Sequence, residues 1–311
     1  MRWVRAVGAA RWGQNGLVFL TALALSLAFG IGLNRPSGPA RITVLPTADA
    51  ITYLIEDDDG RRIIVGGGGS DGALRAFSDR TPPWDRRVDL LVLPPPFRDH
   101  LPGATEIVQR TNVGRVLELG GPGGKPPQRY DPWQLATLDR GHIPERLWGH
   151  AAIPLARGVT LDLVAPDAPD GVPLRLPTKA PKPASSARSL SATTPIDPEA
   201  GAAPGGYLRL TNGTTSLLLA LGAPDATLPG FARLIGPTLF VAPDAPSLPT
   251  LVGTVRPWAL IDLFSGQAPD STTLPPRTLL VPQGRAFTML LDPRGVRLRG
   301  IPNIPAWATP A

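Results

Sequence analysis

The sequence predicts an α/β sandwich, in which two β-sheets pack together and helices cover their outer faces. Segments with strand character outnumber helical ones, and they are of two kinds. Residues 90–93 are continuously apolar, as in a strand buried on both faces, whereas residues 41–45 alternate between apolar and polar. Hydrophobic residues make up 42% of the 311 residues, which is enough for a substantial core.

Turn signals and apolar runs give the order of the expected elements. Strands are expected at 41–45, 50–55, 62–65, 89–93, 114–119, 159–164, 207–210, 216–221, 238–242, 258–263, 278–281, 287–291 and 295–298. Helices are expected at 71–80, 105–111, 131–138 and 228–234. Asp71 is a suitable N-cap, and Asp131 followed by Pro132 forms an N-cap and first-turn pair.

Composition limits the chemistry that the chain can perform. There is no cysteine, so disulfides and thiolate metal sites are excluded. The net charge of +6 comes almost entirely from arginine, because Lys125, Lys179 and Lys182 are the only lysines. Arginine suits phosphate contacts. These arginines are scattered along the chain and do not form one basic run, so charge alone does not predict a nucleic-acid site.

The N-terminal region predicts a membrane anchor. Residues 16–33 carry no charge, and as a helix they would span about 27 Å, close to the thickness of a bilayer core. Arg2, Arg5 and Arg11 precede them, which favours residues 1–15 in the cytoplasm and the rest of the chain outside it. A cleaved signal peptide is the alternative, although no A-x-A site follows the apolar run.

Beyond a spacer at 34–40, we expect one domain over residues 41–304 and a tail at 305–311. Residues 166–206 interrupt the strand pattern with a segment rich in Pro, Ala and Ser. Such a composition predicts a flexible loop. Because strands continue on both sides of it, the segment is interpreted as an insertion within the domain.

One predicted core strand ends in an unusual way. The apolar residues 90–93 run directly into Pro94, Pro95 and Pro96, and Phe97 follows. Asp99 and His100 come immediately afterwards. The prolines could simply terminate the strand, or they could occupy positions where reactive side chains are usually found.

Four segments carry a resemblance to a known family: "RITVLPTADAITYLIEDDDGRRIIVGGGG", "PPWDRRVDLLVLPPPFRDHLPGATEIVQRTNVGRVLELG", "YLRLTNGTTSLLLALGAP" and "TVRPWALIDLFSG". In order and spacing they resemble the extracellular C-terminal metallo-β-lactamase-like domain of the ComEC family of DNA-uptake (competence) proteins. The resemblance implies a four-layer αββα sandwich after one transmembrane helix. It also implies a location on the outer side of the cell membrane and a link to DNA uptake.

The same resemblance implies a two-zinc site, and here the sequence departs from the family. The family's ligand motifs are Asp-Gly-Gly, T-H-x-H-x-D-H, T-G-D and H-H-G-S. Matched position by position, their ligands fall on Gly66, Pro95, Phe97, Ala223 and Pro243. None of these side chains can bind a metal ion. We therefore expect no bound cofactor and interpret the chain as a pseudoenzyme that keeps the scaffold without its dinuclear centre.

Three ligand-type residues remain near these positions: Asp99, His100 and Asp244. They could form a single weak metal site, and zinc would then be the cofactor. The alternative is that Asp99 caps a helix and His100 packs against the former pocket. Two functions follow: a non-catalytic domain that binds DNA or a protein or has a structural role, or a metal-dependent hydrolase or nuclease with a rebuilt site.

Other candidate motifs have simpler interpretations. The glycines at 66–69 and at 120–124 lack the spacing of a phosphate-binding loop, so they are interpreted as tight turns. His142 and His150 lie in a stretch that predicts loops and solvent exposure. Asp225 is interpreted as a helix N-cap.

Overall fold

The computed structural model describes the following residues: 39–45, 47, 50–69, 72–95, 97–120, 130–147, 149–165, 173–175, 206–222, 236–243, 248–264, 276–282 and 284–301. The predicted anchor at 16–33 and the predicted helix at 228–234 lie outside them, as do the tail and most of the 166–206 insertion. Within this described part of the chain, no helix is long and apolar enough to cross a membrane.

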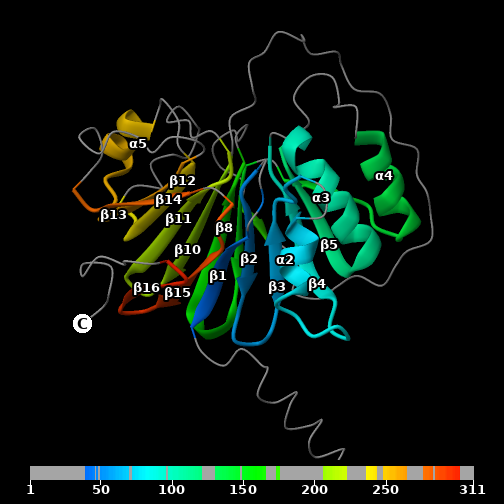
Figure 1. The fold of residues 1–311 in the computed structure, drawn as a ribbon, viewed down its shortest axis with the longest axis horizontal. Helices are drawn as coiled ribbons and strands as arrows, with labels where there is room; N and C mark the ends of the chain where they lie inside the picture. Colours follow the sequence, from blue (N-terminus) through cyan, green and yellow to red (C-terminus); the bar gives the residue numbers. More distant parts are fainter. Residues whose placement is uncertain are drawn as a thin grey trace, which may run out of the picture.

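Two eight-stranded sheets form the centre of the molecule (Figure 1). The first sheet has the order β16 (Gly295–Arg299), β15 (Phe287–Asp292), β1 (Ala40–Leu45), β2 (Thr52–Glu56), β3 (Arg62–Val65), β4 (Arg87–Leu93), β5 (Asn112–Leu119) and β6 (Glu145–Leu147). Strands β3 to β6 are parallel, and the pairings from β16 to β3 are antiparallel.

The second sheet mixes the two pairing modes in the same way. Its order is β14 (Thr278–Pro282), β13 (Ala259–Phe264), β12 (Leu239–Pro243), β11 (Thr215–Ala220), β10 (Tyr207–Asn212), β8 (Val159–Val164), β7 (His150–Pro154) and β9 (Pro173–Arg175). Strands β11 to β14 run parallel, whereas β10 is antiparallel to both β11 and β8.

Helices cover the outer face of each sheet. Three of them pack beside the first sheet in Figure 1, namely α2 (Gly72–Ser78), α3 (Phe97–Arg110) and α4 (Tyr130–Asp139). Helix α5 (Leu248–Val255) covers the second sheet. The order of layers is therefore α, β, β, α. This mixed α/β sandwich confirms the predicted class and is consistent with a metallo-β-lactamase-like fold.

Alternation along the strands builds three separate cores. Ile42, Leu217 and Met289 belong to the core between the two sheets. Leu54 and Leu91 face the opposite way and pack under α2 and α3. Because successive strand side chains point to opposite faces, one strand contributes to two cores, which explains why strands such as β11 are buried along their whole length.

The strand predictions agree closely with the structure, but several other elements differ. Helix α3 begins at Phe97, eight residues before the predicted start at 105, and α5 was not predicted. Strands β6 and β7 lie in the stretch that predicted loops. Strand β9 lies inside the predicted flexible insertion and pairs in parallel with β7.

The early start of α3 has a local explanation. Pro102 lies inside the helix and has no N–H to donate, so its presence disfavours a helix at this point. The N–H of Gly103 donates to the carbonyl of Gly68, outside the helix, at 3.1 Å. Contact with the glycine-rich segment at 66–69 therefore supplies a backbone partner at the point where proline interrupts the helical bonding.

A buried acid connects the outer helices to the first sheet. Glu118 at the end of β5 is buried, and its carboxylate accepts a hydrogen bond from Trp133 Nε1 of α4 at 2.9 Å. The same carboxylate pairs with Arg146 Nε of β6 at 3.2 Å. Two charge-assisted bonds thus compensate for the burial of this charge.

We expect Glu118→Ala to lower the free energy of unfolding by about 2–4 kcal/mol, because it leaves the Trp133 donor unsatisfied and removes a buried charge partner. Glu145→Ala is the matched control, since Glu145 is exposed and its pair with Arg115 should contribute less than about 1 kcal/mol. Urea denaturation of the full-length protein in detergent, followed by circular dichroism, measures both. Equal losses would contradict a structural role for Glu118.

Candidate functional site

The strand ends beside which the resemblance predicts ligand positions lie at one end of the sandwich. Gly66 directly follows β3, and its N–H donates to the carbonyl of Val92 in β4 at 2.8 Å. Pro94 follows β4, Leu221 follows β11, and Pro243 ends β12. The register of the parallel pairs therefore brings the predicted ligand positions of each sheet to its carboxyl edge.

His100 lies at the junction between these strand ends. It belongs to the first turn of α3 and is only 1% exposed. Its Nδ1 accepts a hydrogen bond from the N–H of Gly67 at 3.3 Å. A second hydrogen bond joins the imidazole to the backbone of Leu221, at the end of β11 in the other sheet. One side chain therefore links the two sheets through backbone groups.

The charge state of His100 follows from this environment. Burial lowers the pKa of His100 from 6.5 to about 4, and the hydrogen bond to the Leu221 backbone offsets only part of that effect. The imidazole is neutral at physiological pH. Because Nδ1 accepts from Gly67, the proton is placed on Nε2.

Several positions at which the resemblance implies metal ligands hold buried apolar side chains. Pro94 and Pro95 are buried at the end of β4. Phe97 is buried as well and belongs to the core under α3. At these positions, where the resemblance implies metal ligands, the structure places apolar groups that fill space.

Two glycines are required by this packing. Gly66 has φ +89°, and a Cβ there would lie 2.9 Å from the carbonyl oxygen of Ile51 and 3.0 Å from Nδ1 of His100. A Cβ on Gly67 would lie 2.3 Å from the backbone of His100 and of Ala104 in α3. The segment is therefore more than a tight turn, because α3 packs directly on its backbone.

A buried tyrosine strengthens the same junction. The hydroxyl of Tyr53 in β2 donates to the carbonyl of Ala220, the last residue of β11, at 3.1 Å. Burial raises the pKa of Tyr53 far above its usual value, so the group remains a neutral donor. Together, Tyr53 and His100 attach the end of β11 to the first sheet, and we call these two side chains and their backbone partners the inter-sheet joint.

Of the residual metal candidates, the structure describes Asp99 and His100. Asp99 is half-buried in the first turn of α3, where the helix dipole stabilises its negative charge. It lies inside the helix and is therefore not the N-cap that the sequence suggested. His100 already uses its imidazole in the joint. Ala223 and Asp244 lie outside the described residues. Among the residues that are described, no group of three or more His, Asp or Glu side chains could hold a metal. The donor set described here does not fit zinc.

The two other histidines are less exposed than the sequence predicted. His142 is half-buried, and burial together with the nearby Arg140 lowers its pKa. His150 lies in β7, not in a loop, and its Nε2 is 3.0 Å from Oδ1 of Asp162 in β8. Cross-strand pairing places these two residues on one face of the sheet, which explains the contact. Asp225 lies outside the described residues.

Comparison with known proteins gives similarity in structure only. No family model matches the sequence, and no curated protein sequence matches it. A diphosphatase of the PhnP family has a TM-score of 0.45 and 11% identity over 80% of this chain and 97% of its own. Zn(2+)-bound PqqB from Methylobacterium extorquens has a TM-score of 0.38 and 12% identity over 65% and 72%. A long form RNase Z from yeast has a TM-score of 0.44 and 9% identity over 86% and 50%.

These three proteins have the metallo-β-lactamase fold. The identities and TM-scores transfer no activity, metal or substrate to this chain. Membership of the DNA-uptake family, which the sequence suggested, stays a prediction.

The buried neutral His100 should make the protein sensitive to acid. Its pKa is about 4 in the folded state and 6.5 when unfolded, so its protonation favours unfolding as pH falls from 6.5 to 4. We expect this group alone to remove about 3 kcal/mol of stability over that range. His100→Gln should be less stable than the native protein at pH 7 but should lose less stability on acidification.

Urea denaturation between pH 7.5 and pH 4 measures this difference. His142→Gln is the control, because His142 is only half-buried and its replacement should leave most of the acid sensitivity in place. If His100→Gln and the native protein lose stability in parallel, the neutral buried imidazole is not the cause.

Restoring the acid of the family motif should also be destabilising. We expect Gly66→Asp to cost more than about 3 kcal/mol, because it creates backbone overlap and buries a carboxylate beside an occupied imidazole. Gly60→Asp is matched to it, with φ +77° and no atom within 4 Å of the added Cβ, and should cost about 1 kcal/mol. Thermal denaturation distinguishes the two, and a mild effect at Gly66 would contradict the close packing.

Proposed function

We propose that this chain is a non-catalytic domain of the metallo-β-lactamase fold, held at the outer face of the cell membrane, where it binds a partner or has a structural role. One observation carries the proposal: the imidazole of His100 is bonded to backbone groups that directly follow a strand of each sheet, Gly67 after β3 and Leu221 after β11. A metal ion could bind this imidazole only by displacing Gly67 or Leu221.

The neighbouring positions support the same function. A dinuclear hydrolase needs several imidazole and carboxylate ligands around an activated water. Here Pro95 and Phe97 fill the corresponding space. Position 66 accepts only glycine, because a Cβ there would lie too close to His100. No catalytic step is therefore assigned to this end of the sandwich.

The membrane location rests on the sequence of the N-terminal region. Residues 16–33 have the length and composition of a spanning helix, with arginines before them. The first described strand begins at Ala40. Few residues separate the two, so an anchor would hold the domain close to the membrane surface.

The proposed partner of this domain is DNA or a protein. The resemblance to DNA-uptake proteins and the net charge of +6 favour DNA. If DNA binds through arginine–phosphate contacts, its affinity falls steeply as salt is raised, because counterions are released on binding. A protein partner would show a weaker dependence on salt.

Metal content and hydrolysis test the proposal directly. We expect full-length protein, purified in detergent and dialysed against zinc or manganese, to retain well below one ion per chain. We also expect no hydrolysis of phosphodiesters above the background of the metal alone. Elemental analysis and an assay with bis-(p-nitrophenyl) phosphate provide the two measurements.

The alternative, a metal-dependent hydrolase with a rebuilt site, predicts the opposite result. Near-stoichiometric metal and turnover that is lost in both Asp99→Ala and His100→Ala would establish it and refute the proposal. His142→Ala is the control for non-specific loss of activity. Circular dichroism of each variant confirms that it is folded.

A further inference from the structure

A cavity of about 560 Å³ lies at the end of the sandwich opposite the inter-sheet joint. It is lined by residues that precede β12 and β13 and by the hairpin that joins β15 to β16. Thr215 Oγ1, at the amino end of β11, donates to the carbonyl of Pro293 in that hairpin at 3.0 Å. The cavity is therefore built on the amino ends of the parallel strands, whereas the lost metal site is at their carboxyl ends.

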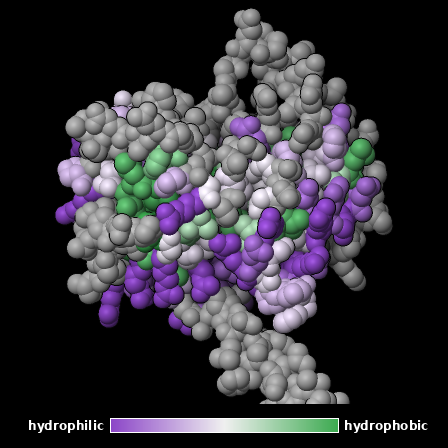
Figure 2. Space-filling view, in the orientation of Figure 1, coloured by the Kyte–Doolittle hydropathy of each residue, from purple (hydrophilic) through white to green (hydrophobic). Residues whose placement is uncertain are grey.

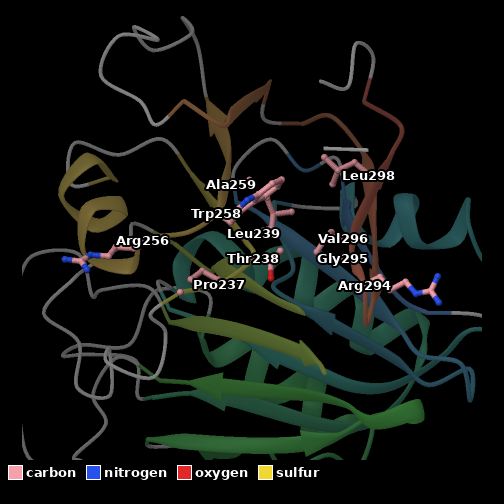
Figure 3. Close-up of a pocket in the computed structure, with 11 residues that line it drawn as sticks. Pro237, Thr238, Leu239, Arg256, Trp258, Ala259, Arg294, Gly295, Val296 and Leu298 are labelled. Carbon is pink, nitrogen blue, oxygen red and sulfur yellow. The ribbon is translucent and has the colours of Figure 1, made fainter. Parts of the chain in front are cut away.

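The interior of the cavity is apolar and its rim is positively charged. Leu239, Val296 and Leu298 form part of the interior. Arg256 and Arg294 lie on opposite sides, and their guanidinium groups point away from the centre in Figure 3, so they border the opening without filling it. The lining residues that the structure describes include no acid.

The charge of the rim is not neutralised by its neighbours. Asp292 is the adjacent acid, and its carboxylate already accepts from the N–H of Arg294 and pairs with Arg297 at 3.1 Å. Within the described residues, the side chains of Arg256 and Arg294 make no ion pair. This arrangement complements a ligand that has an anionic head and an apolar body.

Two further features indicate a binding surface. Trp258 is 49% exposed at the cavity, and the guanidinium of Arg277 lies 4.3 Å from the centroid of its ring. Arg256 has φ +53° immediately after α5, a conformation in which glycine is usual at the end of a helix. A charged residue at a strained backbone position points to a role for its side chain.

The cavity lies at the end of the domain from which the N-terminal region departs. Ala40, the first residue of β1, pairs with Leu291 of β15, and the hairpin with Arg294 follows directly. The spacer at 34–39 can extend at most about 20 Å. A helix at 16–33 would therefore place this end of the sandwich, not the end with the inter-sheet joint, next to the bilayer.

We propose that this cavity binds an anionic phospholipid of the membrane, with apolar lipid groups against Trp258, Val296 and Leu298 and the anionic headgroup at the opening, where Arg256 and Arg294 form a positive rim on opposite sides. Tryptophan and arginine are the residues that favour the interface between lipid and water. On the face seen in Figure 2, hydrophobic side chains gather over the second sheet and hydrophilic ones border them. The inference rests on the membrane anchor of the proposed function.

Photo-crosslinking in nanodiscs tests this site with the full-length protein. The probes are phosphatidylglycerol and phosphatidylcholine with a diazirine on the acyl chain, and mass spectrometry locates the adducts. We expect adducts in peptides that contain Trp258 and Val296, formed with phosphatidylglycerol in preference to phosphatidylcholine. The double variant Arg256→Gln/Arg294→Gln should weaken the apparent affinity roughly tenfold or more, because each arginine near an anionic surface contributes to binding.

The control is Arg110→Gln/Arg140→Gln, which removes the same charge from exposed positions on α3 and after α4 and should leave the cavity adducts unchanged. Adducts that are absent from the cavity, or equal for both lipids and both double variants, would overturn the site. Carbonate extraction separates the two proposals. If carbonate releases the protein from membranes, both the anchor and the lipid site are refuted. If the protein is retained but no adducts form in the cavity, only the lipid site is refuted.

Discussion

Burial of one neutral imidazole determines what the carboxyl end of this sandwich can do. Nδ1 of His100 accepts from the N–H of Gly67, which follows β3 of the first sheet, and the imidazole also bonds to the backbone of Leu221, which follows β11 of the second. A buried polar group without partners is costly, so these bonds and the position of α3 depend on each other. The same constraint removes the imidazole from metal chemistry, because a ligand nitrogen must be free and aimed at the ion.

The packing at the carboxyl end of the sandwich follows from the buried position of His100. A side chain on Gly66 would overlap the imidazole, and a side chain on Gly67 would overlap α3. Pro95 and Phe97 then close the space that a ligand cluster would need. Replacing buried charged groups with well-packed apolar ones is often neutral or stabilising, which gives a physical reason why a scaffold can lose its metal centre and keep its fold.

The sequence predicted most of the strands. At the candidate site it predicted which residue types are present but not the contacts that they make. Residues 159–164 and 62–65 became β8 and β3 with the expected bounds, because apolar runs between turn signals are strong local patterns. That Pro95 and Phe97 cannot bind a metal ion was also predictable, since it depends on residue type alone. The partners of His100 were not, because backbone N–H and carbonyl groups leave no signature in sequence. Helix α5 could have been found from its apolar spacing at Leu248, Leu251, Val252 and Val255, but Pro249 and Gly253 obscured it.

The two ends of the sandwich therefore differ in physical character. In open α/β sheets ligands usually bind beyond the carboxyl ends of parallel strands, where loops diverge. Here that end is closed by Tyr53 and His100, which bond across the sheets. The amino ends of β12 and β13 instead border a cavity with an apolar interior and a positive rim. The inter-sheet joint has no catalytic role, but its hydrogen bonds hold the two sheets in a fixed arrangement. A preformed cavity requires such a rigid frame. A closed carboxyl end and an open cavity at the amino end are compatible consequences of the same packing.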